Sequence, residues 1–251
     1  MNKFSIITPI LKVDNNFKRN FKSVLKNKDK SFNYIIVANT NVIKKLKNIV
    51  KNFFFIHIIE EKKILGLYPA INLALKSNYC NNFYIILGQD DFLTNSNFSK
   101  EINEEINKKN DRIPDILTLK THATQMFKRK KNLRKENILY KLIVNLRYIF
   151  AHHTGGMLIK KNLHKKFGYY NEKYKISSDY LFLKKIKRKI FIKRTEIISA
   201  EIGRHGISAR EPLLSLFERY LIDLSFNNKF NLHNFLYFAY SMLKQTRLNY
   251  K

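Results

Sequence analysis

The sequence predicts an α/β fold in which a mostly parallel central sheet is flanked by helices. Apolar, β-favouring runs alternate with segments whose apolar residues recur at helical spacing. This alternation requires crossover connections, which produce parallel strands with helices packed against them. The fourth run, at 84–87, is followed closely by two adjacent carboxylates, Asp90 and Asp91. Ligands of open α/β sheets bind just beyond the carboxyl ends of the strands, so we expect a ligand site here.

The elements of the first half follow in order from the same patterns. The expected strands are 4–9, 34–39, 53–59 and 84–87. The expected helices between them are 17–25, 42–50 and 70–76. Pro9 is expected to end the first strand because proline has no N–H group to give to the sheet ladder.

The second half has a different pattern, with longer polar stretches between its apolar runs. We expect helices at 98–110, 161–167 and 178–187, the second of them stopped by Gly168. Strands are expected at 115–120, 157–160 and 191–199, and the basic run at 128–135 is expected to be an exposed loop. Leucines and aromatics at helical spacing predict two C-terminal helices, at 212–225 and 231–245.

Composition limits the classes of protein that this chain can belong to. Its 251 residues are 45% hydrophobic and 14% aromatic, which suffices for a substantial core. The formal net charge of +29 favours contact with polyanions, anionic headgroups or phosphorylated substrates. The lysines are spread along the chain, however, and no nucleic-acid-binding motif is visible, so we expect no nucleic acid as partner.

Cysteine content and hydropathy indicate the compartment. The single cysteine, Cys80, excludes an intramolecular disulfide and favours a reducing compartment. No apolar run approaches the roughly 18 residues of a membrane span, and no secretory signal is visible. We expect a cytoplasmic protein that touches the inner face of the plasma membrane without crossing it. The basic, aromatic segment 230–243 could form that contact, or could pack on the core or in a homodimer.

Several segments, taken in order, resemble motifs of the family 2 glycosyltransferases, which have the GT-A fold. The segments are SIITP at 5–9, YIIVAN at 34–39, GLYPAIN at 66–72, LGQDD at 87–91, KKNLHKKFGYY at 160–170 and KYKISSDY at 173–180. The resemblance covers roughly residues 3–208. It implies a Rossmann-like nucleotide-sugar-binding half at 1–95, a smaller acceptor and catalytic half at 96–208, and a C-terminal helical extension at 209–251.

The resemblance assigns the paired carboxylates to a metal. Moving a sugar from a nucleotide diphosphate leaves negative charge on the departing diphosphate, and a divalent cation held by carboxylates neutralises it. Mn²⁺ or Mg²⁺ is the implied cofactor, with Asp91 as the direct ligand and Asp90 facing the sugar or ribose. The alternative for the pair is a solvated turn after a core strand.

Asp179 is implied to be the general base of an inverting displacement. A base must lie within hydrogen-bond reach of the acceptor hydroxyl whose proton it removes. The alternative is helix capping, because Ser177, Ser178 and Asp179 precede a helical run and such residues cap helices without any catalysis. Both roles are compatible with one side chain.

The resemblance assigns further residues to the substrates. On the nucleotide-sugar side these are Thr8, Pro9, Asn39, Gly66, Asn72 and Asp90. His205, in a late His-Gly-Ile-Ser loop, is implied to reach the metal or diphosphate, and His153 the acceptor side. Asn72 could instead be a simple cap, and His153 a packed or surface histidine.

The sequence also departs from the family pattern. The acid that usually follows the second strand is absent, and Asn39 takes its place as the expected reader of the nucleotide base. The acid that usually precedes the helix-start glycine is missing too, and Glu60 or Glu61 could replace it only with a shifted loop. These departures leave the nucleotide open, and with it the degree of activity.

Two functions of different classes follow from these patterns. The first is an inverting glycosyltransferase that moves a sugar from a nucleotide-diphosphate donor to a glycan or lipid-linked acceptor in surface polysaccharide biosynthesis. The second is a non-catalytic basic protein that holds a polyanion on the same fold, and its binding would weaken steeply with salt. A nucleotidyltransferase ranks lower, because no glycine-rich, lysine-bearing phosphate loop is visible at 8–12.

Overall fold

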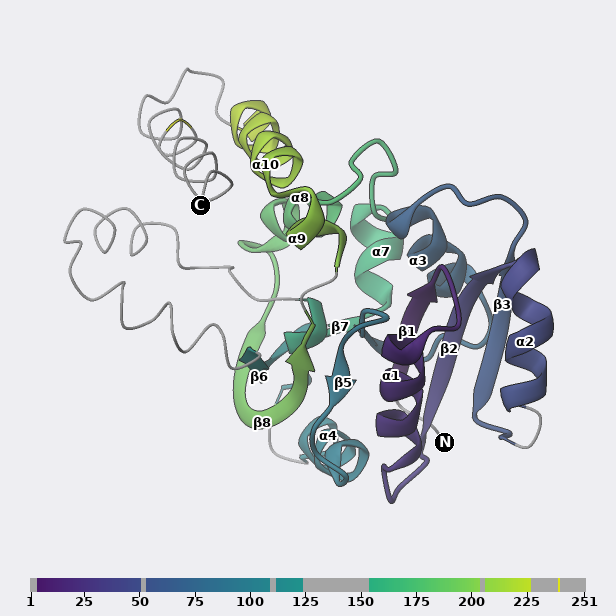
Figure 1. The fold of residues 1–251 in the computed structure, drawn as a ribbon. Coiled ribbons are helices and arrows are strands. Elements are labelled where there is room, and N and C mark those ends of the chain that lie inside the picture. The colour runs from purple at the N-terminus through teal and green to yellow at the C-terminus, as the bar shows by residue number, and fades with distance from the viewer. Residues whose placement is uncertain are drawn as a thin grey trace, which may run out of the picture.

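The computed structural model describes residues 4–50, 53–108, 112–123, 154–203, 206–226 and Ala239. Its core is one eight-stranded sheet with the order β3-β2-β1-β4-β7-β6-β8-β5 (Figure 1). The strands are β1 (Phe4–Ile10), β2 (Phe32–Asn39), β3 (Ile56–Glu61), β4 (Phe83–Ile86), β5 (Phe92–Leu93), β6 (Ile116–Ala123), β7 (Met157–Lys160) and β8 (Ile192–Ile202).

The first four long strands are parallel, as the alternation of patterns predicted. β1 pairs with β2 on one side and with β4 on the other, and β2 also pairs with β3. Side chains on both faces of β1, β2 and β4 are buried, which explains why these strands are rich in successive apolar residues and do not alternate. The four carboxyl ends therefore lie along one edge, which we call the carboxyl edge.

The second half continues the same sheet with mixed directions. β7 is antiparallel to both β4 and β6, whereas β6 and β8 are parallel. The two-residue strand β5 follows the Asp90–Asp91 loop and pairs antiparallel with the end of β8, through Phe92–Glu201 and Leu93–Ala200. This pairing brings the end of β8 beside the loop that carries the paired carboxylates.

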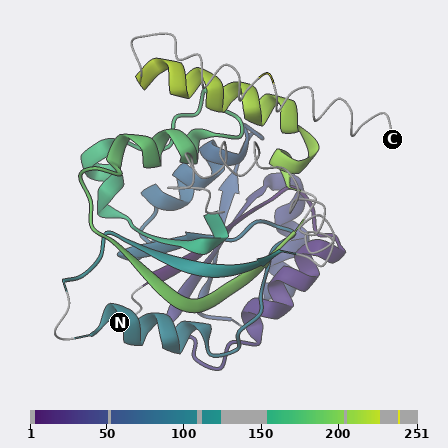
Figure 2. The ribbon, with the colours of Figure 1, turned by 90° about the vertical axis from the view of Figure 1, so that its left-hand side faces the viewer.

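Helices cover both faces of the sheet (Figure 2). On one face lie α1 (Asn15–Leu25), α2 (Thr40–Val50) and α4 (Phe98–Ile106), packed against side chains such as Ile6 and Ile36. On the other face lie α3 (Leu67–Lys76), α7 (Asn162–Phe167) and α8 (Ser178–Ile186), packed against Ile7 and Ile35. Neighbouring residues of a strand thus serve opposite layers.

Two short elements and one long helix complete the described fold. A single 3-10 turn, Thr154–Gly156, precedes β7, and α9 (Ile207–Arg210) leads into α10 (Pro212–Phe226). α10 contacts α8 and extends across the top of the molecule in Figure 2. No helix among the described residues is long and apolar enough to cross a lipid bilayer. The segments expected at 128–135, 230–243 and 231–245 lie outside the described residues, apart from Ala239.

The expectation that Pro9 ends the first strand was wrong by one residue. β1 continues to Ile10, and Pro9 pairs with Val37. The carbonyl of Ile7 points toward β4 and accepts from Leu87 N at 2.9 Å, so the backbone of Pro9, two residues on, points the same way. β4 has already ended at that level, and the missing N–H of proline therefore costs no ladder bond.

Candidate active site

The loop after β4 holds the carboxylate of Asp91 in a fixed position. Asp91 is only 2% exposed. Its Oδ2 accepts from Gly88 N at 2.9 Å and its Oδ1 accepts from Gly203 N at 2.7 Å. The side-chain amide of Asn20, on α1, donates to the backbone oxygens of Gly88 and Asp91 at 2.9 and 2.8 Å. Asp91 is therefore not the solvated turn residue of the alternative interpretation.

Asp90 lies against the backbone of Gly203. A Cβ at position 203 would come within 2.3 Å of Asp90 Oδ2 and within 2.5 Å of its backbone oxygen. Only glycine fits there, because real Cβ atoms do not approach other atoms so closely. Unlike Asp91, Asp90 is half-buried. The two acids thus meet the end of β8 from the same loop.

The two predicted histidines lie outside the described residues. His205 comes two positions after Gly203, and Gly203 itself contacts both carboxylates. His153 lies just before the 3-10 turn Thr154–Gly156, and the nearest described part of the chain is that turn. Both assignments stay predictions.

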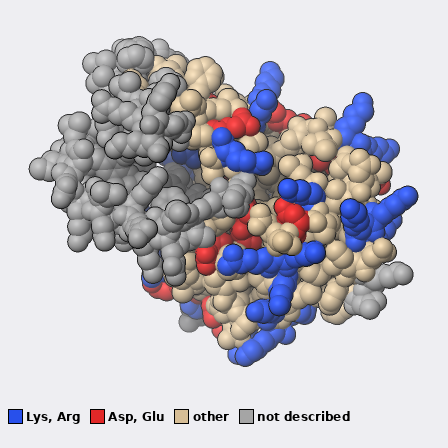
Figure 3. Space-filling model, viewed as in Figure 1, with Lys and Arg blue, Asp and Glu red and all other residues tan. Residues whose placement is uncertain are grey.

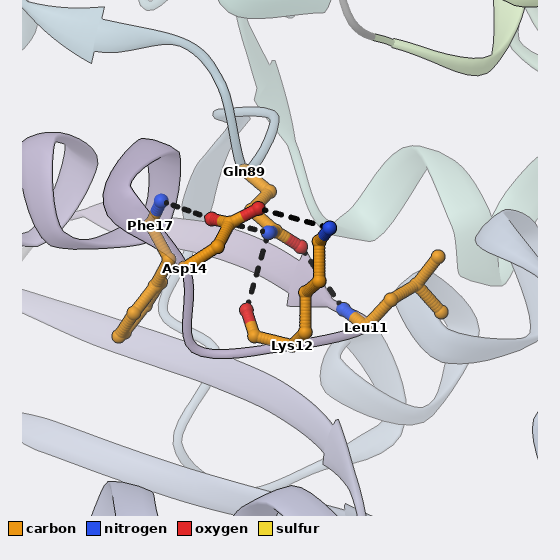
Figure 4. Close-up of polar contacts among 5 residues, drawn as sticks. All are labelled: Leu11, Lys12, Asp14, Phe17 and Gln89. Carbon is orange, nitrogen blue, oxygen red and sulfur yellow. Dashed lines mark hydrogen bonds and ion pairs between the residues drawn. The ribbon is translucent and has the colours of Figure 1, made fainter.

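Gln89 fastens the β1–α1 loop to the carboxylate loop, a role that the sequence did not indicate (Figure 4). Its Oε1 accepts from Leu11 N at 3.0 Å, and its Nε2 donates to Lys12 O at 3.1 Å and to Asp14 Oδ1 at 2.9 Å. Asp14 in turn caps α1 by accepting from Phe17 N at 2.9 Å. One glutamine side chain thereby fixes a turn that begins where β1 ends.

The charge of Asp14 is stabilised by these same contacts. Burial alone would raise the pKa of Asp14. The hydrogen bonds from Phe17 N and Gln89, together with the ammonium of Lys12 at 3.6 Å, outweigh burial and lower this pKa below its ordinary value. Asp14 is therefore ionised at neutral pH and remains a strong acceptor for the loop.

Asp179 stands in the first turn of α8 and is tied to the start of α3. Its Oδ1 accepts from Tyr68 Oη at 2.8 Å and from Tyr180 N at 2.8 Å. Its Oδ2 makes no hydrogen bond within the described residues, and the side chain is half-buried. The N-cap residue of α8 is Ser177, whose side chain makes no cap bond. Asp179 therefore has one oxygen held by the protein and one that makes no hydrogen bond to the described residues.

Tyr68 places Asp179 at the carboxyl edge of the sheet. Tyr68 is the second residue of α3, which begins directly after Gly66 on the side where β3 ends. Asp90 and Asp91 follow the end of β4, which is parallel to β3 in the same sheet. The three acids, distant in sequence, thus belong to loops and helix starts on one edge.

Tyr68 itself is almost fully buried. Burial and the negative charge of Asp179 raise the pKa of Tyr68 well above its ordinary value. Its hydroxyl also lies 2.6 Å from Ile176 O, so two acceptors compete for one proton. The phenol stays protonated and serves as a donor to the residues around the start of α8.

The predicted nucleotide-side residues occupy the carboxyl ends of β1, β2 and β3, with differing exposure. Thr8 is buried within β1, and Pro9 beside it is half-buried. Asn39 ends β2, where its Oδ1 accepts from Asn41 N at 3.1 Å and its Nδ2 donates to Glu61 O at 3.3 Å. Gly66 is exposed and has φ 122°, a conformation that favours glycine.

Asn72 joins α3 to the loop after α7. Its Nδ2 donates to Tyr170 O and to Glu172 Oε1, both at 2.9 Å. Its Oδ1 accepts from Tyr170 N at 3.2 Å, and the side chain is 2% exposed. The interpretation of Asn72 as a cap of α3 does not match these contacts, since Asn72 lies inside the helix.

Glu60 and Glu61 each accept a hydrogen bond from another part of the chain at this edge. Glu61 is 6% exposed and accepts from Leu65 N at 3.0 Å, which shapes the loop before Gly66. Glu60 accepts from Thr40 Oγ1 at 2.7 Å. The loop that could have shifted to bring an acid forward is thus held by Glu61.

A buried hydrogen-bonded chain lies beneath this region. His164 Nδ1 faces the carbonyl of Gly168 at 3.1 Å, so Nδ1 carries the proton and Nε2 accepts from Tyr84 Oη at 2.6 Å. Tyr84 then accepts from Tyr170 Oη at 2.8 Å. Burial lowers the pKa of His164 to about 4, against a smaller raising effect from Gly168. His164 is therefore neutral, and the motif at 160–170 contains a core residue.

The carboxylates of Asp90 and Asp91 supply some of the ligands that a hard divalent cation needs. Carboxylate oxygens are the ligands that Mg²⁺ and Mn²⁺ prefer, and such ions take their remaining ligands from phosphate oxygens or water. Asp90 and Asp91 meet this requirement in kind, and Asp91 is oriented by two N–H groups. No group of three or more His, Cys, Asp or Glu residues within the described ranges could hold a metal.

Charges on the molecular surface are unevenly arranged. Figure 3 shows several acidic side chains in the middle of one face, with lysines and arginines projecting around them. Basic side chains that project from a surface raise the local concentration of anionic ligands. The high net charge is thus compatible with a phosphorylated substrate as well as with a polymer.

Comparison with known proteins identifies the fold. No protein-family model matches the sequence, and a search of curated proteins finds no match. Among solved structures, S. aureus TarS 1-349 has a TM-score of 0.64 at 18% identity, over 88% of this chain and 64% of that one. Its complex with UDP-GlcNAc has a TM-score of 0.66, also at 18% identity, over 88% of this chain and 65% of that one.

Two further glycosyltransferases share this architecture. Mannosyltransferase PcManGT from Pyrobaculum calidifontis, in complex with GDP-Man and Mn²⁺, has a TM-score of 0.63 at 11% identity, over 93% of this chain and 69% of that one. Glucosyl-3-phosphoglycerate synthase from Mycobacterium tuberculosis, in complex with Mn²⁺, UDP and phosphoglyceric acid, has a TM-score of 0.57 at 12% identity. The match covers 89% of this chain and 78% of that one. At these identities the likeness is one of fold, and it confirms the predicted GT-A fold.

Proposed function

We propose that this chain transfers a sugar from a nucleotide-diphosphate donor to a hydroxyl group of a glycan or lipid-linked acceptor, with inversion at the anomeric carbon. The observation that carries the proposal is the arrangement of acids: Asp90 and Asp91 in the loop after β4, and Asp179 at the start of α8, all at the carboxyl edge. The fold neighbours are transferases whose structures contain UDP-GlcNAc, UDP or GDP-Man.

The paired carboxylates would hold Mn²⁺ or Mg²⁺ in this proposal. When bound, the ion neutralises the charge that develops on the departing diphosphate. Asp91, whose carboxylate is oriented by Gly88 N and Gly203 N, would be the ligand, and Asp90 would face the sugar or ribose. His205, two residues beyond Gly203, would approach the same ion or diphosphate.

Asp179 would act as the general base. Its free Oδ2 takes the proton of the acceptor hydroxyl while that oxygen attacks the anomeric carbon and the bond to the diphosphate breaks. Tyr68 and Tyr180 N hold Oδ1, so that the carboxylate presents Oδ2 in a fixed direction. One base and one displacement give inversion.

Asn39, Gly66, Thr8 and Pro9 would line the nucleotide side, and His153 the acceptor side. The half-buried end of β2, with Asn39, suits an uncharged reader of a base edge. Exposed Gly66 allows a ligand to approach the backbone closely. For Asn72 we propose a supporting role, because its amide holds the loop at Tyr170.

The cellular setting follows from the charge and from the nature of such acceptors. We propose a role in surface polysaccharide biosynthesis at the cytoplasmic face of the membrane, in peripheral contact with anionic lipid. The chain spans 64% of the length of TarS 1-349, so the activity of that whole protein is not transferred to it.

Thermal-shift measurements test the proposed function. We expect UDP, GDP, CDP or TDP to stabilise the chain in the presence of Mn²⁺, because a ligand of the folded state raises its stability in proportion to ln(1 + [L]/Kd). Asp91→Asn should abolish the Mn²⁺-dependent shift, whereas Asp179→Ala should keep the shift and lose turnover.

The matched control is Glu196→Gln, which removes a charge from a side chain 86% exposed on β8 and should leave the shift unchanged.

A basic polyanion-binding protein would give the opposite pattern. DNA would then stabilise the chain, the effect would fall steeply with salt, and none of the nucleotides would act with Mn²⁺.

A further inference from the structure

α10 inserts two buried carboxylates into the catalytic half of the fold. Glu218 and Asp223 are 6% and 4% exposed, although charged side chains are seldom buried without partners. Asp223 accepts from Tyr180 Oη at 2.6 Å and from the ammonium of Lys184. Tyr180 and Lys184 belong to α8, so Asp223 fixes α10 along that helix.

Glu218 binds the backbone just before α8. Its Oε1 accepts from Lys175 N at 2.7 Å, and its Oε2 accepts from Ile176 N at 2.9 Å and Ser177 N at 2.8 Å. Three successive N–H groups that converge on one carboxylate form an anion-binding concavity, and the helix N-terminus adds to its positive potential. These N–H groups belong to the residues that lead into α8, and the side chain of the N-cap residue, Ser177, makes no cap bond of its own.

The held segment leads directly to Asp179. Ile176 donates its N–H to Glu218 and offers its carbonyl to Tyr68 Oη at 2.6 Å. Tyr68 Oη is also the partner of Asp179 Oδ1. The peptide at Ile176 is thus clamped between α10 and α3, and the clamp ends on the carboxylate of Asp179.

We propose that Glu218 is a positioning residue that sets the direction of the Asp179 carboxylate through residues 175–177 and Tyr68. This inference rests on the proposed function, in which Asp179 is the general base. It makes the start of the C-terminal extension a part of the catalytic apparatus. A base displaced by about 1 Å loses on the order of 10²-fold in rate, so the contact need not touch substrate to matter.

Hydrogen–deuterium exchange of the full-length chain tests the clamp itself. In Glu218→Ala the amides of residues 175–177 should exchange at least tenfold faster than in the wild type, with protection in β1 and β4 unchanged. Glu218→Gln keeps one acceptor oxygen and should give a smaller increase. Glu211→Gln, at an exposed position just before α10, is the matched control and should show none. Wild-type protection of these amides in Glu218→Ala would overturn the proposal.

Turnover distinguishes positioning from stability alone. We would measure hydrolysis of UDP-GlcNAc and GDP-mannose by release of the nucleoside diphosphate, expressed per nucleotide-binding site. Glu218→Gln should lower kcat at least tenfold with KM within twofold, because donor contacts are untouched. Equal kcat in Glu218→Gln and Glu211→Gln would overturn the positioning role.

The two proposals fail in different ways. If the wild type neither binds nucleotide nor hydrolyses a donor, the proposed function fails and the positioning role falls with it. The exchange of amides 175–177 would still report whether Glu218 holds the segment. If donor turnover is present and the Glu218 variants match the control in both measurements, only the inference about Glu218 is wrong.

Discussion

Tyr68 has one hydroxyl proton and two acceptors within 2.6 and 2.8 Å, the carbonyl of Ile176 and the carboxylate of Asp179. A shared proton of this kind couples the backbone before α8 to the proposed base. Burial keeps the pKa of Tyr68 well above its ordinary value, so the proton is not lost at neutral pH. Hydrogen bonds to a charged acceptor are stronger than neutral ones, which favours donation to Asp179.

His164 is a second residue whose protonation matters to the fold. Its folded-state pKa is about 4, whereas the ordinary value is 6.5. Between these values the unfolded chain binds a proton that the folded chain does not. The contribution of His164 to the free energy of unfolding is therefore greatest above pH 6.5. It is lost as the pH drops toward 4, which lowers the free energy of unfolding by roughly 3 kcal/mol in total.

Urea unfolding at pH 7.5 and pH 5 measures this loss. His164→Gln should reduce the pH dependence over that interval, since the titrating group is removed, although the variant is less stable at both values. His122→Gln changes an exposed histidine and is the control, with the wild-type dependence retained. An unchanged slope in His164→Gln would contradict the assignment.

The contact between the β4–β5 loop and the end of β8 is the decisive feature at the scale of elements. A two-residue strand, β5, is enough to bring Gly203 against Asp90 and Asp91. The loop after β4 is also fastened to the β1–α1 turn by Gln89. The loop after β4 thus holds together the β1–α1 turn and the end of β8, which are distant in the sequence.

Gly203→Ala should disrupt this anchor. The new Cβ would lie within 2.3 Å of Asp90 Oδ2 and 2.5 Å of its backbone oxygen, so the loop must shift. We expect a loss of about 1–3 kcal/mol in stability and the loss of the Mn²⁺-dependent nucleotide shift. Thermal-shift and urea titrations measure both effects.

Gly206→Ala provides the matched control for that substitution. A Cβ at position 206 would meet no atom within 4 Å, although the residue is only three positions along the same chain. Its stability and nucleotide shift should equal those of the wild type. Equal behaviour of the two alanine variants would contradict the close packing of Asp90 on Gly203.

The elements with a strong apolar periodicity could be predicted from the sequence. The strand at 157–160 and the helices that begin at 178 and 212 were predicted to within one residue at each end. β5 was missed because two residues carry no periodic signal. The start of β3 was predicted three residues early and its end two residues early, because the aromatic run at 53–55 resembles a strand.

The candidate site was predictable only where motifs carry it. Asp90, Asp91 and Asp179 stand out through the segments 87–91 and 173–180. Gln89, Tyr68 and Glu218 act through partners that lie 40 or more positions away. Gln89 and Tyr68 lie inside the motifs at 87–91 and 66–72, but no local pattern indicates these contacts. Buried polar side chains of this kind become recognisable only when the tertiary contacts are known.

The high positive charge acts at the scale of the whole molecule. A formal net charge of +29 on 251 residues makes the compact state repel itself. Added salt screens such repulsion, because the Debye length falls from about 10 Å at 0.1 M to about 3 Å at 1 M.

We therefore expect the thermal midpoint to rise by several degrees when NaCl is raised from about 0.1 M to about 0.5 M. KCl at equal ionic strength should have the same effect, which separates screening from ion-specific binding. A midpoint that falls with salt would indicate that local ion pairs outweigh the net repulsion. Nucleotide shifts should be compared at constant ionic strength for the same reason.

The pairing of β4 with β7 has a mechanical consequence. The two halves of the molecule are joined through a continuous sheet, and they could separate or rotate only by breaking ladder bonds between Phe83–Tyr84 and Ile159–Lys160. The strands of both halves therefore form one scaffold, and the loops and helix starts at the carboxyl edge are all mounted on it.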